Sequence, residues 1–192
     1  MISIRHERPA DIDAREALLD QAFGEARTRK ASERLREERL PAEGLAFIAA
    51  ESRHVVGTAR LWDIGCGNGQ PALLLGPVAV AADCRGQGIG AALVRRAVAE
   101  ARRLGYGAVV LVGDPPYYSR FGFSGEKTAA LWMPGPFERH RLLAVELIPG
   151  TLDGARGMIN AAGRLEPKPE LAALVAQDRR AERARRHGSR AA

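Results

Sequence analysis

The 192-residue chain is 46% hydrophobic and 27% charged, which is the balance of a single globular domain with a sizeable core. No apolar run reaches the roughly eighteen residues of a membrane span, and the N-terminus lacks a signal pattern, so we expect a cytoplasmic protein without membrane partners. Two cysteines without CxxC spacing and four scattered histidines argue against a disulfide framework and against a metal site.

The formal net charge of +6 is concentrated at the C-terminal end. Residues 164–192 contain eight basic and four acidic side chains, so the remainder is nearly neutral. The hydrophobic pattern also weakens after about residue 150. We therefore divide the chain into a folded domain, residues 1–158, and a basic extension, residues 159–192, helical over Pro169–Arg186 and then frayed.

The first third of the chain alternates between strand and helix periodicity. Apolar residues at every second position indicate strands, and apolar residues three or four apart indicate helices. Proline and glycine mark most of the ends. In chain order we expect a strand over 2–7, a helix over 12–23, a short exposed helix over 29–40, and a hairpin with strands over 46–50 and 54–61.

A continuous apolar run over 72–81 predicts a strand that is covered on both faces. Pro77 interrupts it, and because proline donates no ladder hydrogen bond, we expect a bulge or a parting of neighbouring strands there. A helix over 89–104 and a strand over 108–112 complete a parallel crossover. A brief helix over 117–121 and a last strand over 141–148 follow.

Glycines cluster where the strand over 72–81 leads into the next helix, at Gly86, Gly88 and Gly90. Free backbone N–H groups and the positive helix end favour a phosphate there, and Arg85 adds charge. A tight strand-to-helix turn without a ligand would use the same glycines. The Walker pattern is excluded because no Gly-Lys-Ser/Thr follows. The dinucleotide pattern G-x-G-x-x-A matches, with Asp114 as the ribose acid, but too little chain remains for that fold.

Two motifs in the same order resemble GNAT acetyltransferases. The run RGQGIG at 85–90 is similar to the R/Q-x-x-G-x-G/A motif of that family, and YYSRFGF at 117–123 resembles its FYxxxGF element. The runs LGPVAV at 75–80 and PGTL at 149–152 are similar to the YhbS-like branch of the family. The resemblance covers about residues 1–158.

The resemblance implies a mixed α/β (α+β) GNAT-type fold, with a mostly antiparallel sheet of six to seven strands flanked by helices. It also implies an N-acetyltransferase that uses acetyl-CoA and no metal, with direct attack by a primary amine. Tyr118 matches the tyrosine that protonates the leaving thiolate, whereas Tyr117 is assigned to packing. The residues expected to bind acetyl-CoA are Val78, Ala79, Val80, Arg85, Gly86, Gln87, Gly88, Ile89, Gly90 and Ala91.

The sequence identifies no general base for the amine. No carboxylate lies in the run 73–81, and the nearest acids, Glu51 and Asp63, read more simply as solvated charges. A water chain or a partly neutral amine would remove the need for a base. The family's asparagine near the short helix also has no counterpart, since Asp114 stands four residues before Tyr118.

Two other functions stay open. The chain is then either a GNAT-fold module that binds acyl-CoA without catalysis, or a nucleic-acid-associated protein acting through its arginine-rich tail. The tail arginines in question are Arg179, Arg180, Arg183, Arg185 and Arg186. No aromatic residue follows Phe137, so the tail offers no base stacking, and nucleic acid is not the expected partner. We expect a small-molecule or peptide amine as acceptor. Its identity, the role of the tail and the oligomeric state, a homodimer included, stay open.

Overall fold

The computed structural model describes residues 2–167. Its strands are β1 (Ile2–His6), β2 (Ala46–Glu51), β3 (His54–Cys66), β4 (Gln70–Val80), β5 (Ala108–Val112), β6 (Leu131–Trp132), β7 (Leu142–Glu146), β8 (Gly157–Met158) and β9 (Asn160–Ala161). Its α-helices are α1 (Ile12–Phe23), α2 (Ile89–Arg103) and α3 (Pro115–Tyr118). The expected elements on either side of the glycine cluster are confirmed within a few residues.

One seven-stranded sheet organises the described residues, with the order β1-β2-β3-β4-β5-β7 and β9 added beside β3. Every pair in it is antiparallel except β4 and β5, which are parallel. This confirms the mixed, mostly antiparallel sheet and the parallel crossover through α2. The short β6 and β8 form a separate parallel pair that the sequence did not reveal.

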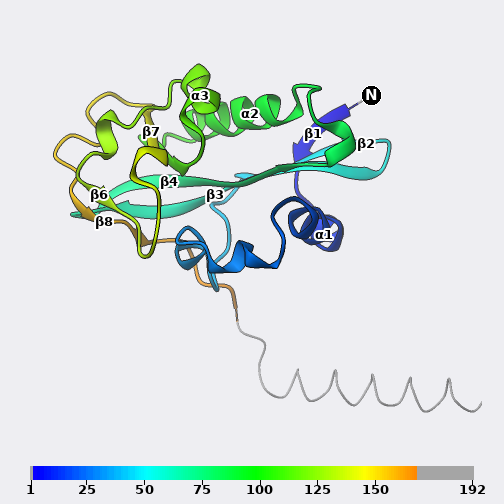
Figure 1. Ribbon diagram of the computed structural model, residues 1–192, viewed down its shortest axis with the longest axis horizontal. Coiled ribbons are helices and arrows are strands. Elements are labelled where there is room, and N and C mark those ends of the chain that lie inside the picture. Colours follow the sequence, from blue (N-terminus) through cyan, green and yellow to red (C-terminus); the bar gives the residue numbers. More distant parts are fainter. Residues whose placement is uncertain (1, 168–192) are drawn as a thin grey trace, which may run out of the picture.

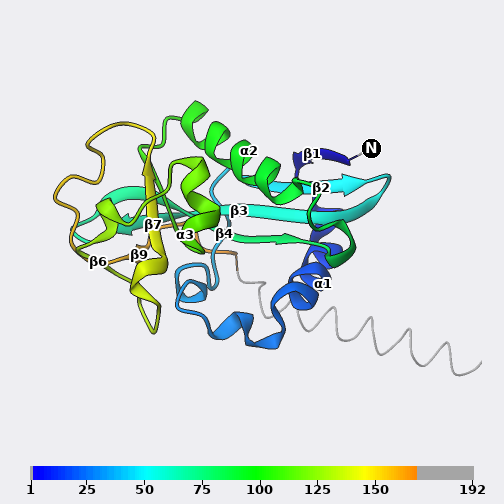
Figure 2. The same cartoon turned by 45° about the horizontal axis from the view of Figure 1, so that its top comes forward.

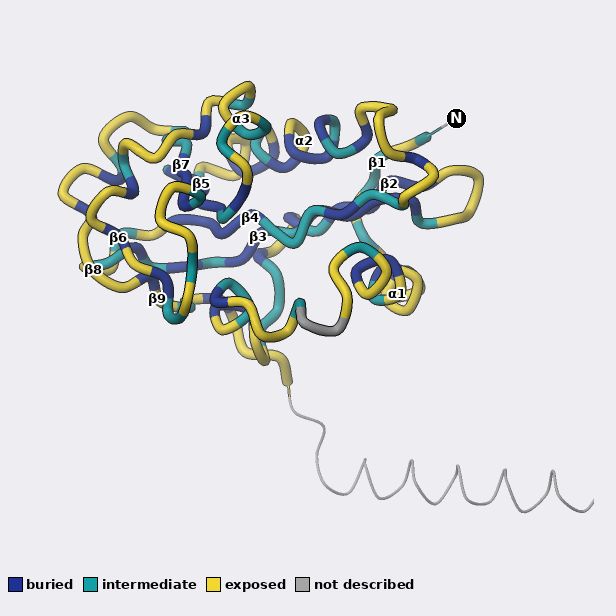
Figure 3. Tube along the Cα trace, viewed as in Figure 1, coloured by how far each residue is buried: buried dark blue, intermediate teal, exposed yellow. Residues whose placement is uncertain are grey.

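Helices and loops cover both faces of the sheet (Figures 1 and 2). Helix α2 covers one face, where Leu61, Leu73 and Val109 belong to the same buried cluster as its own apolar side chains. The opposite face is covered by α1 and by the segment that follows it, over Trp62 and Leu74. Figure 3 shows the resulting buried layer along β3, β4 and β5. The alternation of side chains along each strand produces these two cores.

The sheet opens next to Pro77, as the sequence predicts. Leu75 pairs with Leu61 and Val78 with Ala59, so Gly76 and Pro77 oppose a single residue of β3 and form a bulge. The Gly76–Pro77 peptide bond is cis. On its other side β4 pairs with β5 at only two positions, Leu73 and Leu74. Beyond Leu75 the two parallel strands therefore separate.

Two expectations differ from the structure. The segment 29–40 is not an α-helix: a 3-10 turn at Glu25–Arg29 ends where the segment begins, and another at Glu33–Leu35 lies within it. Its buried apolar side chains are Leu35 and Ala31. Burial of these two side chains does not offset the conformational entropy lost when twelve residues are ordered as a regular helix.

The packed part of the chain also continues past residue 158. Ile159 is fully buried, β9 pairs with β3, and the N–H of Glu166 donates to the carbonyl of Glu38 at 2.8 Å. The expected tail helix, Pro169–Arg186, lies outside the described residues. Within residues 2–167, each helix is too short or too polar to cross a bilayer.

Candidate functional site

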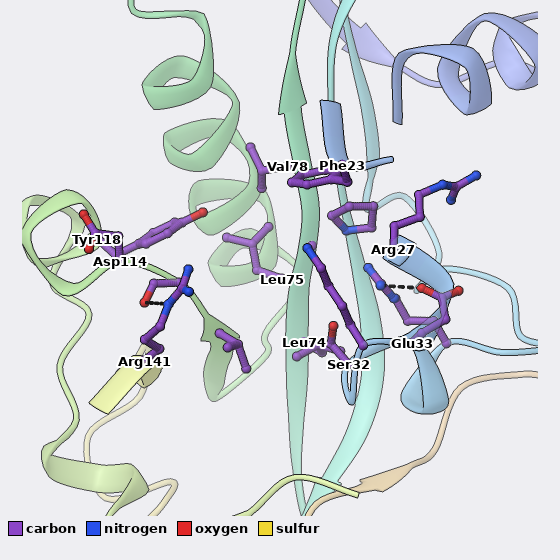
Figure 4. Close-up of a pocket in the computed structure, with 16 residues that line it drawn as sticks. Phe23, Arg27, Ser32, Glu33, Leu74, Leu75, Val78, Asp114, Tyr118 and Arg141 are labelled. Carbon is purple, nitrogen blue, oxygen red and sulfur yellow. Dashed lines mark hydrogen bonds and ion pairs between the residues drawn. The ribbon is translucent and has the colours of Figure 1, made fainter. Parts of the chain in front are cut away.

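A cleft of about 300 Å³ lies where β4 leaves β5. Its floor is the bulged part of β4, and its two walls come from opposite sides of the sheet. Figure 4 shows Tyr118 and Arg141 pointing into it from one wall, with Arg27, Ser32 and Glu33 on the other. The lining residues are Phe23, Arg27, Lys30, Ser32, Glu33, Arg36, Leu74, Leu75, Gly76, Pro77, Val78, Val112, Gly113, Asp114, Tyr118 and Arg141.

The exposed edge of β4 offers backbone hydrogen-bonding groups to the cleft. The N–H of Ala81 donates to β3 at Val56, at 2.9 Å. Because backbone groups alternate in direction along a strand, Ala79 also faces β3, whereas Val78 and Val80 face the side from which β5 has departed. Of the three predicted β4 residues, only Val78 and Val80 thus present their backbone to an added chain.

The bulge is held from below by Trp62. Its indole Nε1 donates to the carbonyl of Gly76 at 2.7 Å, and the residue is 6% exposed. This bond gives the buried indole N–H an acceptor. It also fixes the direction of the Gly76 carbonyl, which lies in the bulge and is not paired with β3. The floor of the cleft is therefore a defined backbone conformation.

A second cavity, of about 370 Å³, lies at the N-terminus of α2. Gly86 and Gly88 both have a φ of +79°, which glycine adopts without strain. The first helical hydrogen bond runs from Ala92 to the carbonyl of Gly88, so the preceding N–H groups are free for a ligand. The predicted residues that line this cavity are Val80, Arg85, Gly86, Gly88, Ile89, Gly90 and Ala91, whereas Gln87 does not line it.

Tyr117 and Arg120 also line the cavity at α2, although sequence reasoning assigned Tyr117 to packing. A Cβ at Gly90 would lie 3.0 Å from the Tyr117 hydroxyl, so this phenol reaches the first turn of α2. The Arg120 guanidinium lies 4.1 Å from the centre of the Tyr117 ring. The sequence signal for this pair was weak, because only the fold brings the short helix against the glycine turn.

Tyr118 lies in the cleft at β4, within an aromatic cluster. Its ring is 4.9 Å from that of Tyr117 and 5.9 Å from that of Phe123, measured between centres. Burial raises the pKa of Tyr118 to about 12, with a further contribution from Tyr117 and an opposing one from Arg141. The phenol is therefore protonated at neutral pH. Gly113 permits this placement, since a Cβ there would lie 2.2 Å from the Tyr118 ring.

The acids nearest in sequence, Glu51 and Asp63, do not line either cavity. Glu51 lies at the end of β2, and Asp63 interacts with Tyr106. The carboxylates that line the cleft are Glu33 and Asp114 instead. Sequence reasoning missed Glu33 because it is distant from β4 along the chain.

Comparison with known proteins matches residues 12–123 to the model of the acetyltransferase (GNAT) family. The N-acetyltransferase YhbS of Escherichia coli strain K12 is 31% identical over 157 residues, which are 81% of this chain and 93% of YhbS. The crystal structure of E. coli YhbS in complex with CoA superposes with a TM-score of 0.72 at 29% identity, covering 84% of this chain and 89% of that one. A GNAT family acetyltransferase from Brucella melitensis in complex with acetyl-CoA gives 0.64 at 25% identity, with 84% and 96% covered.

Proposed function

The chain belongs to the GNAT acetyltransferase family, and on that premise we propose that it transfers an acetyl group from acetyl-CoA to the primary amine of an acceptor by direct attack. The observation that carries the proposal is the exposed edge of β4, which joins the glycine turn at Val80 to the cleft at Val78. One extended ligand can therefore place its phosphates at α2 and its reactive end beside Tyr118. The GNAT relatives in complex with CoA and acetyl-CoA support this choice of ligand.

The residues at α2 fit a diphosphate. The free N–H groups of the first helical turn converge with the positive end of a fifteen-residue helix, and Arg85 lies beside them. Gly90 leaves room next to the Tyr117 hydroxyl, where a side chain would fill the cradle. Along β4, the backbone of Val78 and Val80 would pair with the pantetheine amides as an added strand does. We assign the N–H of Val78 as the donor toward the acetyl carbonyl oxygen.

Tyr118 is the proposed acid for the leaving thiolate. Its phenol carries its proton at neutral pH because burial raises its pKa to about 12. The thiolate would leave into the same partly desolvated cleft, which raises the pKa of the thiol as well, so the rise in the pKa of Tyr118 is offset in part. A hydroxyl that donates to the developing thiolate stabilises it whether or not the proton transfers completely.

The test combines acetyl-CoA binding, by calorimetry, with thiol release across a panel of amines, amino acids and peptides. We expect Tyr118→Phe to lower turnover about a hundred-fold or more, while affinity for acetyl-CoA survives. Tyr106→Phe is the matched control, because its hydroxyl interacts with Asp63 outside the cleft.

Three outcomes separate the alternatives. Binding without thiol release on any amine identifies a non-catalytic acyl-CoA module. No affinity for acetyl-CoA refutes the proposed function itself. Unchanged turnover in Tyr118→Phe leaves the transferase in place but removes Tyr118 from the mechanism. The cytoplasmic location stays a prediction, and the oligomeric state, a homodimer included, and the role of the basic tail stay open.

A further inference from the structure

Cationic side chains gather around the cleft at β4. Lys30 and Arg36 lie on the wall formed by the segment after α1, and Arg141 lies on the wall that carries Tyr118. Arg36 and Arg141 are both close enough to Lys30 for their charges to act on it. Partial burial lowers the pKa of Lys30, and the charges of Arg36 and Arg141 lower it further.

Within residues 2–167 the three cations have few anionic partners, because Arg36 and Arg141 make one ion pair each and Lys30 makes none. Arg36 is only 8% exposed, and among the described residues its ion pair joins Nη2 to Glu33 at 2.5 Å. Its buried Nε has no hydrogen-bond partner in the described part of the chain. A buried, unsatisfied guanidinium N–H is costly, so its presence calls for an explanation.

The other two cations are also available to a ligand. Within residues 2–167, the close contact of Lys30 is the ring of Phe23, 4.6 Å from Nζ to the ring centre, and it makes no ion pair. Arg141 donates from Nη1 to Glu138 at 3.2 Å, a pair exposed to solvent, and from Nε to the carbonyl of Gly113 at 3.4 Å, so its Nη2 is the nitrogen left for a ligand among the bonds of residues 2–167. By contrast, Arg27 lines the same cleft but is already paired with Glu16 and Asp20.

The phosphates of CoA do not account for this charge. The glycine turn at α2 forms its own cavity, and none of the three cations lines it. The cations instead line the end of the β4 edge at which the acetyl group and the acceptor amine would meet. They are therefore assigned to the acceptor side of the site.

We propose that the acceptor carries a carboxylate beside its amine, and that Lys30, Arg36 and Arg141 bind this carboxylate. The proposal rests on the acetyltransferase function and names the substrate class for that same site. A carboxylate presents two oxygens in one plane, which suits the planar fork of a guanidinium. A cleft of about 300 Å³ that also receives the acetyl end limits the acceptor to the size of an amino acid or a peptide end.

The same cations also favour loss of the amine proton without a dedicated base, although Glu33 and Asp114 line the same cleft and act in the opposite direction. Neighbouring positive charge disfavours an ammonium and lowers its pKa. Lys30 already experiences this effect from Arg36 and Arg141. An acceptor bound through its carboxylate would place its own ammonium in that field, which increases the share of neutral, nucleophilic amine at pH 7.

The test compares matched acceptors at saturating acetyl-CoA. L-Alanine, L-phenylalanine, L-glutamate, β-alanine and 4-aminobutyrate are each paired with the amide of the same carboxyl group, and phosphoethanolamine tests a phosphate in place of the carboxylate. For the best acid, we expect kcat/KM to exceed that of its amide by at least about 30-fold. Lys30→Met should reduce this ratio about tenfold. Arg29→Met, an exposed cation of the same segment that does not line the cleft, is the matched control.

Each result decides the proposal. Equal transfer to acids and amides, or transfer to neutral amines alone, overturns the carboxylate class and leaves the transferase intact. A preference for phosphoethanolamine reassigns the cations to a phosphate and overturns the carboxylate. If no acceptor reacts, calorimetry on the CoA-saturated protein compares N-acetylphenylalanine with its amide, and equal affinities overturn the proposal. Absence of acetyl-CoA binding overturns the proposed function, and this inference falls with it.

Discussion

Gly113 offers a way to displace Tyr118 without changing its chemistry. In a Gly113→Ala variant the new Cβ would lie 2.2 Å from Cε2 of Tyr118 and 2.6 Å from Cδ2. To restore an ordinary contact of 3.4 Å from 2.2 Å, the ring must retreat by about 1.2 Å. The backbone of Gly113 is not in the left-handed region, so the clash with the ring is the main cost.

A displacement of about 1 Å is enough to lower a rate about a hundred-fold when the displaced group acts in the transition state. We therefore expect Gly113→Ala to lower kcat by that factor and to cost about 1–3 kcal/mol in the free energy of unfolding. Thiol-release kinetics measure the first effect, and urea unfolding measures the second. Gly125→Ala is the matched control, because the nearest atom to its Cβ is the carbonyl oxygen of Leu142, at 3.9 Å.

A double-variant cycle shows whether the loss passes through the hydroxyl. In a Tyr118→Phe background no hydroxyl remains to be misplaced, so Gly113→Ala should lower kcat by less than about threefold. If the hundred-fold loss persists there, the glycine acts on something other than the hydroxyl. A folded Gly113→Ala variant with normal turnover would refute the placement of Tyr118 at the reacting atoms.

Three further predictions concern the glycine turn, the floor of the cleft and an acid-sensitive ion pair. Gly90→Ala places a methyl group 3.0 Å from the Tyr117 hydroxyl, so calorimetry should show acetyl-CoA affinity about tenfold weaker; unchanged affinity would place the ligand elsewhere. Trp62→Phe removes the indole donor below the bulge, and urea unfolding should show a loss of about 1 kcal/mol with a raised KM for acetyl-CoA. The hydrogen bond from Arg5 lowers the pKa of Asp11 from 3.8 to about 2, so its stabilising effect is complete above pH 4 and is lost as the pH falls toward 2. Asp11→Asn should remove this part of the loss of unfolding free energy at acid pH. Parallel profiles of the free energy of unfolding against pH for the two proteins would contradict the assignment.

Much of the fold follows from local patterns in the sequence. The apolar runs over 72–81 and 108–112 and the periodic helix between them have clear end signals, so their order predicts the parallel crossover, and the first run is found as the strand Gln70–Val80. Pro77 marks the bulge because the absence of an N–H is a property of that residue alone. The glycine turn is equally local, since positive φ values and free N–H groups arise from adjacent residues.

The structure corrects the segment after α1, where local signals are weak. The sequence predicts a short exposed helix, whereas 3-10 turns bury Leu35 and bring Lys30, Glu33 and Arg36 to the cleft. Their position depends on packing against Trp62 and its neighbours on β3, far away in the chain. Periodicity within one segment contains no information about such a partner.

The sequence by itself determined most of the strands and helices, their order and the glycine turn, because each depends on residues within one or two helical turns of one another. Only the tertiary structure decided which tyrosine faces which cavity, that Glu33 replaces Glu51 and Asp63 beside the cleft, and that three cations meet there. Those arrangements join segments that are distant in the chain, up to the 111 residues between Lys30 and Arg141, and the free energy that holds them together comes from packing on the shared sheet.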